Sequence, residues 1–332
     1  MLLICYGTRP EYIKMLPIIQ NCKDRLKHKT LFTGQHQDLV KTPSDLDLKI
    51  SKGRNRLDTI MSSVMNSIDF EKEGITSVIV QGDTTTALAV AITAFHNKIP
   101  VIHLEAGLRT GDFDNPYPEE MNRQMIARIA SLHLCPTNES AVNLASERVL
   151  GRVYTVGNTV LDNLSDVKTS YDNKVLVTLH RRENHEIMDS WFRSLESLAQ
   201  KYKDYEFLLP IHPNPKVKKH KKILKKVKVV EPLSHSDLID YMKDCKVVIT
   251  DSGGIQEESA YLKKKSIVCR KTTERVEGKD IFSFLCGAPE HLEELFNNSI
   301  NDYIIELPCP YGTGNSGKKI VDILVEDDWR KA

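Results

Sequence analysis

The chain has 332 residues, of which 40% are hydrophobic and 27% are charged, with 46 Lys and Arg against 45 Asp and Glu. This is the composition of a globular protein and excludes a disordered or fibrous chain, and the length suits about two domains. A dedicated nucleic-acid-binding protein usually carries a clear basic excess, so we expect no nucleic-acid partner.

The sequence carries no signal for membranes, export or metal binding. No apolar run approaches the roughly 18 residues of a membrane span, and the N-terminus becomes polar too early for a signal peptide. The seven cysteines show no CxxC spacing, which predicts neither a disulfide framework nor a zinc site. We therefore expect a cytoplasmic protein without a membrane partner and without a bound metal.

Short β-branched runs alternate with segments of helical spacing through the first half of the chain. Continuous apolar runs of this length are typical of parallel strands that helices cover on both faces. We predict such strands at 2–7, 28–34, 75–83, 100–107, 131–137 and 152–158.

A second series of strands follows a polar stretch at 164–174, which is the expected linker. Alternation of strand and helix gives a doubly wound sheet, so we predict the α/β class with two Rossmann-like domains, at 1–165 and 170–310. The strands of the second domain are predicted at 175–180, 206–212, 226–232, 246–250 and 266–269.

Two conspicuous runs have ordinary explanations. The Lys-rich run 216–228 has apolar residues at helical spacing, which predicts a helix with its lysines in solvent; a docking patch for an anionic partner is the alternative. The glycine-rich run 312–317 matches GxGxxG, but no strand precedes it, so it does not predict a dinucleotide site. A minor contact of this run with a phosphate stays open.

Acidic residues gather at the ends of two strands in the first half of the chain. Asp83 ends one predicted strand and Glu105 ends the next, and Glu119 and Glu120 follow with Arg123 close by. Parallel sheets bind ligands at the carboxyl ends of their strands, so these carboxylates predict a proton-transfer site. For Asp83, a helix N-cap or a buried hydrogen-bond acceptor is the structural alternative.

Cationic and imidazole side chains also follow predicted strands. Arg9 and Lys14 come after the first strand, His180 and Arg181 end the strand at 175–180, and His212 ends the next one. Each histidine alone is more often structural. Together they predict an anion pocket in the second half.

A diphosphate site is predicted where the strand at 246–250 runs into Asp251, Ser252, Gly253 and Gly254 and then into a helix. Two glycines let the backbone approach a phosphate, and the helix N-terminus favours negative charge. Glu258, one turn into the helix, is placed to accept the two hydroxyls of a ribose. Downstream, Arg270 and Arg275 are expected to add positive charge.

Ten motifs in this order resemble those of the non-hydrolysing UDP-N-acetylglucosamine 2-epimerases. They are GTRPEYIKMLP, TGQH, VQGDTTTALA, HLEAGLRTGD, PYPEEMNRQ, GNTVLDNL, TLHRREN, IHPNP, DSGGIQEE and TTER, spanning about residues 1–280. The resemblance implies the GT-B fold, in which the active-site cleft lies between two Rossmann-like domains and a last helix, here 311–332, crosses back to the first. It also implies a homodimer and a reaction without NAD or metal.

The resemblance implies a concrete reaction on UDP-GlcNAc and UDP-ManNAc. Family enzymes remove the C2 proton and expel UDP to leave 2-acetamidoglucal, then return UDP and a proton to the other face. Asp83, Glu105 and Glu119 match the acid–base carboxylates and His180 matches the histidine near the diphosphate. The residues expected to bind the UDP-sugar are Arg9, Lys14, Arg123, Arg181, His212, Ser252, Gly253, Gly254, Glu258 and Arg275.

Departures from the family pattern keep alternatives open. Gln35 and His36 favour the non-hydrolysing branch and lie where some bacterial members bind an activating UDP-GlcNAc, but the chain is shortened after this point. In the segment around TTER, the family's prolines are missing, as is the acidic residue before TTER, which is expected to loosen the nucleotide loop or change the base or sugar accepted. A hydrolysing epimerase that releases ManNAc and UDP, a GT-B glycosyltransferase and a non-catalytic nucleotide-sugar-binding protein are the alternatives.

Overall fold

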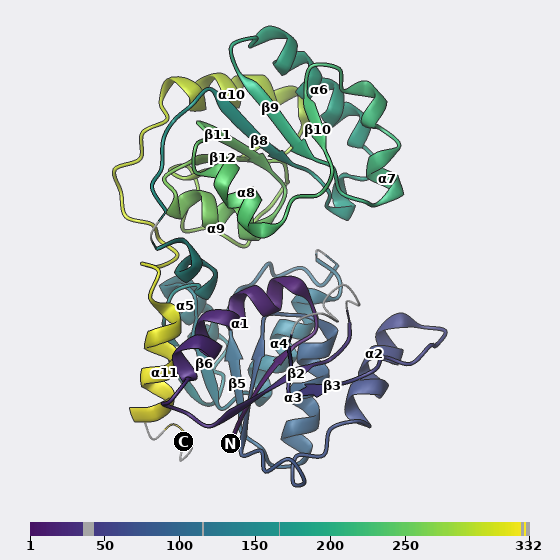
Figure 1. The fold of residues 1–332 in the computed structure, drawn as a ribbon, viewed down its shortest axis with the longest axis vertical. Helices are drawn as coiled ribbons and strands as arrows, with labels where there is room; N and C mark the ends of the chain where they lie inside the picture. Colours follow the sequence, from purple (N-terminus) through teal and green to yellow (C-terminus); the bar gives the residue numbers. More distant parts are fainter. Residues whose placement is uncertain (36–42, 115, 166, 327–328, 330–332) are drawn as a thin grey trace. The chain divides into compact units, whose positions relative to one another are not determined.

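The computed structural model describes residues 1–332 except 36–42, 115, 166, 327–328 and 330–332. The chain divides into two compact units, Met1–Asn163 with Gly312–Ala332, and Leu164–Tyr311. Each unit contains one parallel sheet with helices on both faces (Figure 1), which confirms the predicted α/β class. No helix in the described part of the chain is both long and apolar enough to cross a membrane.

The sheet of the first unit has seven parallel strands in the order β3-β2-β1-β4-β5-β6-β7. Six of these strands were predicted, whereas the two-residue strand β3 was not. The strands are β1 Leu2–Tyr6, β2 His28–Phe32, β3 Leu46–Asp47, β4 Ser77–Gln81, β5 Val101–Leu104, β6 Leu132–Cys135 and β7 Arg152–Thr155.

Alternate side chains of β1 contact helices on opposite faces of this sheet. Leu3 and Cys5 belong to a core with α2, α3 and α4, whereas Leu2 and Ile4 belong to a core with α1 and α11. Because both faces are covered, the strands read as continuous apolar runs. The helices are α1 Arg9–Cys22, α2 Arg56–Met65, α3 Thr85–His96, α4 Glu119–Ile129, α5 Asn138–Ser146 and α11 Ser316–Glu326, with a 3-10 helix at Thr159–Leu164.

The last helix, α11, lies side by side with α1 in the first unit (Figure 1). Gly317 permits this approach, since a Cβ there would lie 2.8 Å from backbone and side-chain atoms of Pro17. The Asp162 carboxylate accepts hydrogen bonds from the backbone N–H groups of Ser316 and Gly317, at 2.9 and 2.7 Å. The amides that we left open for a phosphate therefore bind a carboxylate of the chain itself.

The sheet of the second unit has six parallel strands in the order β10-β9-β8-β11-β12-β13. All except β13 were predicted. The strands are β8 Lys174–Thr178, β9 Glu206–Pro210, β10 Lys228–Val230, β11 Val247–Thr250, β12 Lys265–Val268 and β13 Ser283–Leu285. Its helices are α6 Met188–Lys201, α7 Pro215–Lys218, α8 His235–Met242, α9 Gly253–Tyr261 and α10 Leu292–Asn301, with 3-10 helices at Arg182–Asn184, Lys221–Ile223 and Pro289–His291.

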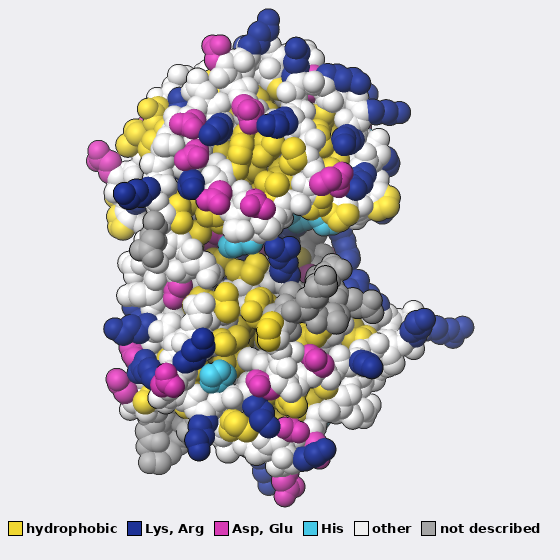
Figure 2. All heavy atoms as spheres, viewed as in Figure 1, with side chains coloured by type: hydrophobic (Ala, Val, Ile, Leu, Met, Phe, Trp, Pro, Cys, Tyr) yellow, Lys and Arg dark blue, Asp and Glu magenta, His cyan; other side chains and the backbone are white. Residues whose placement is uncertain are grey.

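The prediction of one helix over the Lys-rich run 216–228 is wrong. The run contains the short helix α7, a 3-10 turn and the start of edge strand β10. The Glu196 carboxylate of α6 accepts hydrogen bonds from the backbone N–H groups of residues 225–227 at 2.8–3.4 Å, which holds this segment outside a helix. Val217 and Leu224 are buried as expected, and Lys and Arg side chains (dark blue) gather on the surface around α7 in Figure 2.

Candidate active site

The carboxyl ends of β1, β4 and β5 bring three polar side chains of the first unit together. Lys14 Nζ lies 2.5 Å from Glu105 Oε2, and Gln81 Nε2 donates to the same oxygen. The Glu105 side chain is only 8% exposed, and its backbone has a φ of +64°. A left-handed backbone at a non-glycine residue costs about 1–3 kcal/mol and is found preferentially at functional sites.

A narrow crevice, too tight to hold a water molecule, adjoins this point in the first unit. Its residues come from α1, from the end of β5 and from the segments that follow β6 and β7. Its lining consists of Lys14, Leu104, Glu105, Pro136, Gly157, Asn158 and Thr159.

A buried carboxylate that sequence reasoning missed, Glu11, joins the loops after β1 and β4. It accepts hydrogen bonds from the backbone N–H groups of Gly7 and Thr8, at 2.9 and 2.6 Å, and from the hydroxyl of Thr84 at 2.6 Å. Burial raises the pKa of Glu11. Thr8 and Glu11 form a capping box, whose TxxE spacing was visible in the sequence.

Asp83 follows β4, and α4 holds it by both backbone and side chain. Arg123 Nη2 lies 2.5 Å from Asp83 Oδ2, and Asn122 Nδ2 donates to the Asp83 carbonyl oxygen at 2.7 Å. Thr84, and not Asp83, is the N-cap of α3, because its hydroxyl accepts from Ala87 N at 3.0 Å. The N-cap alternative for Asp83 is therefore excluded.

The acid pair that begins α4 separates into two environments. Glu120 is fully buried and accepts hydrogen bonds from the backbone N–H groups of Thr110 and Gly111, at 3.1 and 3.4 Å. Burial alone would raise the pKa of Glu120, but hydrogen bonds and the charge of Arg123 lower it. Glu119 is half-buried at the first position of the helix. The structure thus makes Glu120 the internal member of the pair.

Two further predicted residues of the first unit lie beside the starts of helices α1 and α3. Arg9 is exposed at the first position of α1. Gln35 accepts a hydrogen bond from the Thr86 hydroxyl at 2.9 Å, which places it beside the start of α3. His36 lies outside the described residues.

In the second unit, Asp251 organises the loop that follows β8. Its carboxylate is fully buried and accepts hydrogen bonds from the backbone N–H groups of His180 and Arg181, at 2.9 and 2.8 Å, and from Asn184 Nδ2 at 3.0 Å. Asn184 also donates to the Cys269 carbonyl oxygen at 2.9 Å. The acid that opens the DSGG motif is therefore an internal acceptor that positions the loop with His180.

The structure brings the two predicted histidines of the second unit together. The rings of His180 and His212 are stacked, with centroids 5.1 Å apart and an interplanar angle of 12°. His180 Nδ1 lies 3.5 Å from Asp251 Oδ1, and the His180 side chain is 37% exposed. Burial and the neighbouring His180 lower the pKa of His212. Two imidazoles at the ends of adjacent strands suit the predicted anion pocket.

The two glycines at the start of α9 have different surroundings. A Cβ at Gly253 would lie 2.8 Å from the guanidinium carbon of Arg275, whereas a Cβ at Gly254 would meet no described atom within 4 Å. Ser252 is the N-cap residue. Because the first amides of a helix have no partner inside it, this end of α9 suits a phosphate.

The arginines around TTER are paired with carboxylates, which sequence reasoning did not predict. Arg270 donates to Glu183 at 2.8 Å and to Glu274 at 3.0 Å. Arg275 donates to Glu257 at 3.0 Å and also to Glu274. Both guanidinium groups are buried, so they hold the loop together and their positive charge is compensated locally.

Glu258, the predicted ribose acceptor, is buried on α9 and bound by a residue that sequence reasoning missed. His235 Nε2, at the first position of α8, donates to Glu258 Oε1 at 2.6 Å. One carboxylate oxygen is thus fixed by a neighbouring helix, which orients the group.

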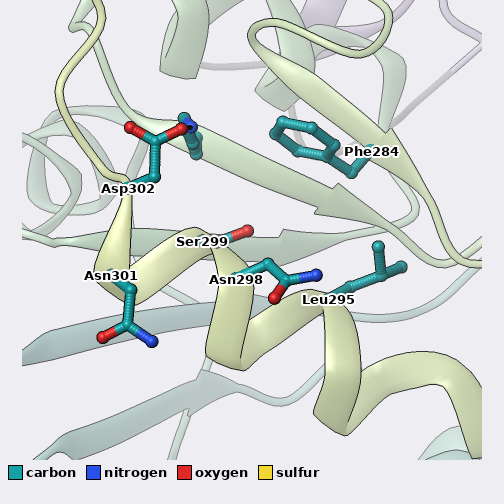
Figure 3. A pocket seen from close by; sticks show the side chains of 7 residues that line it. Phe284, Leu295, Asn298, Ser299, Asn301 and Asp302 are labelled. Carbon is teal, nitrogen blue, oxygen red and sulfur yellow. Dashed lines mark hydrogen bonds and ion pairs between the residues drawn. The ribbon is translucent and has the colours of Figure 1, made fainter.

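A pocket of about 330 Å³ in the second unit is separate from these residues (Figure 3). It adjoins the first residue of β12, at the end of the sheet opposite to DSGG, and Lys265 Nζ binds Asp302 Oδ2 there at 2.7 Å. None of the predicted site residues that the structure describes lines it. Its lining is Lys265, Phe284, Leu295, Asn298, Ser299, Asn301 and Asp302.

Comparison with known proteins agrees with this geometry. A family model described as UDP-N-acetylglucosamine 2-epimerase matches residues 20–325. The chain is 34% identical to the UDP-N-acetylglucosamine 2-epimerase of Neisseria meningitidis, covering 98% of this chain and 99% of the relative. It is 35% identical to that of Bacillus subtilis, covering 96% and 93%.

Solved structures are similar over the same length. The crystal structure of the Neisseria meningitidis UDP-GlcNAc 2-epimerase bound to UDP-GlcNAc has a TM-score of 0.86 at 32% identity, covering 98% of this chain and 100% of that chain. The Methanocaldococcus jannaschii UDP-GlcNAc 2-epimerase in complex with UDP-GlcNAc and UDP has a TM-score of 0.81 at 31% identity, covering 97% and 99%. The chain therefore belongs to the UDP-N-acetylglucosamine 2-epimerase family and is an isomerase, as its motifs indicated.

Proposed function

We propose that the chain interconverts UDP-GlcNAc and UDP-ManNAc by elimination and re-addition of UDP, without net release of free sugar. One observation carries the proposal. Asp83 and Glu105 follow the adjacent strands β4 and β5, and each carboxylate is bound by a cation, Arg123 or Lys14, at 2.5 Å. Two oriented carboxylates suit a reaction in which one group takes a proton and another returns one.

The carboxylates of the first unit supply the proton transfers. One carboxylate takes the proton from C2, the C2–H electron pair forms the C1=C2 bond, and the C1–O bond breaks with its electrons leaving on UDP. In the second half, a UDP oxygen rebinds C1 while a carboxylic acid protonates the opposite face of C2. Asp83, Glu105 and Glu119 share these roles.

The second unit holds UDP while the sugar reacts. The N-terminal amides of α9 at Gly253 and Gly254 and the imidazole of His180 are placed to bind the diphosphate, and Glu258 to bind the ribose. Charge that develops on the departing diphosphate is stabilised by such preorganised donors. Arg181, His212 and Ser252 of this unit belong to the same predicted binding set, as do Arg9 and Lys14 of the first unit. Arg275, also in that set, is paired with Glu257 and Glu274.

Several features of the proposal come from the family likeness alone. A homodimer and a cytoplasmic location stay predictions, and light scattering of the purified protein tests the first. An effector site for UDP-GlcNAc at Gln35 and His36 is tested by the dependence of the initial rate on added UDP-GlcNAc when UDP-ManNAc is the substrate.

Proton NMR of the protein with UDP-GlcNAc in deuterated buffer tests the reaction. We expect UDP-ManNAc that carries deuterium at C2. Free ManNAc with UDP would assign the chain to hydrolysing enzymes, and no exchange at C2 would refute the proposal. Asp83→Asn is expected to abolish turnover and leave UDP affinity within about threefold, because the proposed role of Asp83 is in proton transfer at the sugar and not in binding the nucleotide. Loss of UDP binding together with turnover would make Asp83 structural.

A further inference from the structure

We infer that Arg123 is a positioning residue that acts through Asp83, with Glu120 as its anchor, and that it does not bind UDP. The inference rests on the proposed catalytic role of Asp83. It changes the sequence-based expectation that Arg123 contacts the substrate, and it assigns different roles to the two glutamates of the PYPEEMNR motif.

The contacts of Arg123 point inward. Its side chain is 5% exposed, and its two terminal nitrogens contact Asp83 Oδ2 at 2.5 Å and Glu120 Oε2 at 3.1 Å. A guanidinium is rigid and planar, with its N–H donors at fixed angles. When Glu120 fixes its orientation, the donor that faces Asp83 is fixed as well, and it orients the Asp83 carboxylate. The Asp83 side chain, by contrast, is 26% exposed and reaches solvent.

Glu120 provides the fixed end of this chain of contacts. Besides Arg123, it accepts hydrogen bonds from the backbone N–H groups of Thr110 and Gly111 and from Gln124 Nε2, at 3.1–3.4 Å. The backbone donors lie in the loop that follows β5. The backbone of that loop therefore fixes Glu120, Glu120 fixes the Arg123 guanidinium, and Arg123 fixes the Asp83 carboxylate.

The neighbouring residue on α4 reinforces the same contact. Asn122 Nδ2 donates to the Asp83 carbonyl oxygen at 2.7 Å, so consecutive residues of one helix hold both the backbone and the side chain of Asp83. Glu120 and Arg123 are three residues apart and share one helix face. Glu119 is the first residue of the same helix and keeps its proposed catalytic role, whereas the contacts of Glu120 assign it a structural role.

Loss of the Arg123 guanidinium is therefore expected to lower turnover while UDP binding is retained. A carboxylate that shifts by about 1 Å from its productive place can cost about 100-fold in rate, whereas UDP contacts other groups. We expect Arg123→Met to lower kcat about 100-fold and to leave the UDP dissociation constant within about threefold. Arg123→Lys keeps the charge but lacks the planar guanidinium, so its kcat is expected to lie between those of wild type and Arg123→Met.

The experiment measures kcat, KM and, by calorimetry, UDP affinity for Arg123→Met, Arg123→Lys and wild type. Arg128→Met is the matched control, because Arg128 is exposed on the same helix and should leave every parameter unchanged. Guanidinium chloride at millimolar concentration is expected to restore part of the kcat of Arg123→Ala without changing its UDP affinity.

If Arg123→Met fails to fold, the double variant E120Q/R123M replaces it, since that variant leaves no buried carboxylate without its cation. UDP binding weakened tenfold or more with kcat retained would make Arg123 a UDP ligand and overturn the inference. Wild-type turnover in Arg123→Met would also overturn it while the proposed reaction stands. Turnover retained in Asp83→Asn would instead refute the catalytic role on which the inference depends.

Discussion

His103 is expected to make the first unit less stable as the pH falls below about 6.5. This residue of β5 is fully buried, and its Nε2 donates to the Gly82 carbonyl oxygen at 2.8 Å, directly before Asp83. Its Nδ1 has no hydrogen-bond partner among the described residues. Burial lowers the pKa of His103 to about 3, so the folded protein keeps a neutral ring down to that pH.

The size of the effect follows from the two pKa values. Between pH 3 and pH 6.5 the unfolded chain binds a proton at His103 that the folded chain does not bind, so the free energy of unfolding rises with pH through this window. At pH 5, which is about 1.5 units below the unfolded pKa, the penalty is about 2 kcal/mol relative to pH 7.5 or above.

Urea unfolding of wild type and His103→Gln at pH 5.0 and 7.5, followed by circular dichroism, measures this penalty. Gln can still donate to the Gly82 carbonyl but cannot take up a proton, so the variant should lose about 2 kcal/mol less than wild type between the two pH values. Burial also lowers the pKa of His133, and the comparison removes that contribution because both proteins share it. Equal losses in the two proteins would refute the reasoning.

Two further predictions concern UDP affinity, measured by calorimetry. His235→Ala is expected to weaken UDP binding about tenfold and His235→Gln only about threefold, because Gln can still donate to Glu258 and a hydrogen bond to a charged group is worth about 1.5 kcal/mol or more. Equal losses would show that the hydrogen bond has no part in binding. Gly253→Ala is expected to weaken binding more than the matched Gly254→Ala, because only the first Cβ meets the Arg275 guanidinium; the reverse order would contradict this explanation.

The predictable part of the site consists of residues that end strands. Asp83 and Glu105 follow apolar runs long enough to define parallel strands, and parallel strands place such ends at one edge. Their partners were not predictable in the same way, because Asn122 and Arg123 reach Asp83 from a helix about 40 residues further along the chain. Only Glu11 left a local signature, the capping-box spacing, that sequence reasoning could have used.

The elements that were predicted wrongly from the sequence share one physical cause. Strands β3 and β13 have two and three residues, too few for a periodic pattern. In the Lys-rich run 216–228, apolar residues have helical spacing, but a distant carboxylate, Glu196, binds the amides that a helix would have used. The local structure of each segment depends on a contact with a distant part of the chain: pairing with a neighbouring strand for β3 and β13, and hydrogen bonds to Glu196 for the Lys-rich run. The local sequence pattern does not indicate such contacts.

Contacts with distant residues also hold the loop around TTER in place. Its missing prolines and acidic residue led us to expect a looser nucleotide loop. In the structure, Arg270 joins Glu183 to Glu274, and Arg275 joins Glu274 to Glu257, with both guanidinium groups buried. Removing one partner of a buried ion pair costs about 3–5 kcal/mol, far more than a proline contributes in a loop. Position 271, where the family has the acidic residue, is exposed and lies outside these pairs, so its change leaves the contacts that hold the loop intact.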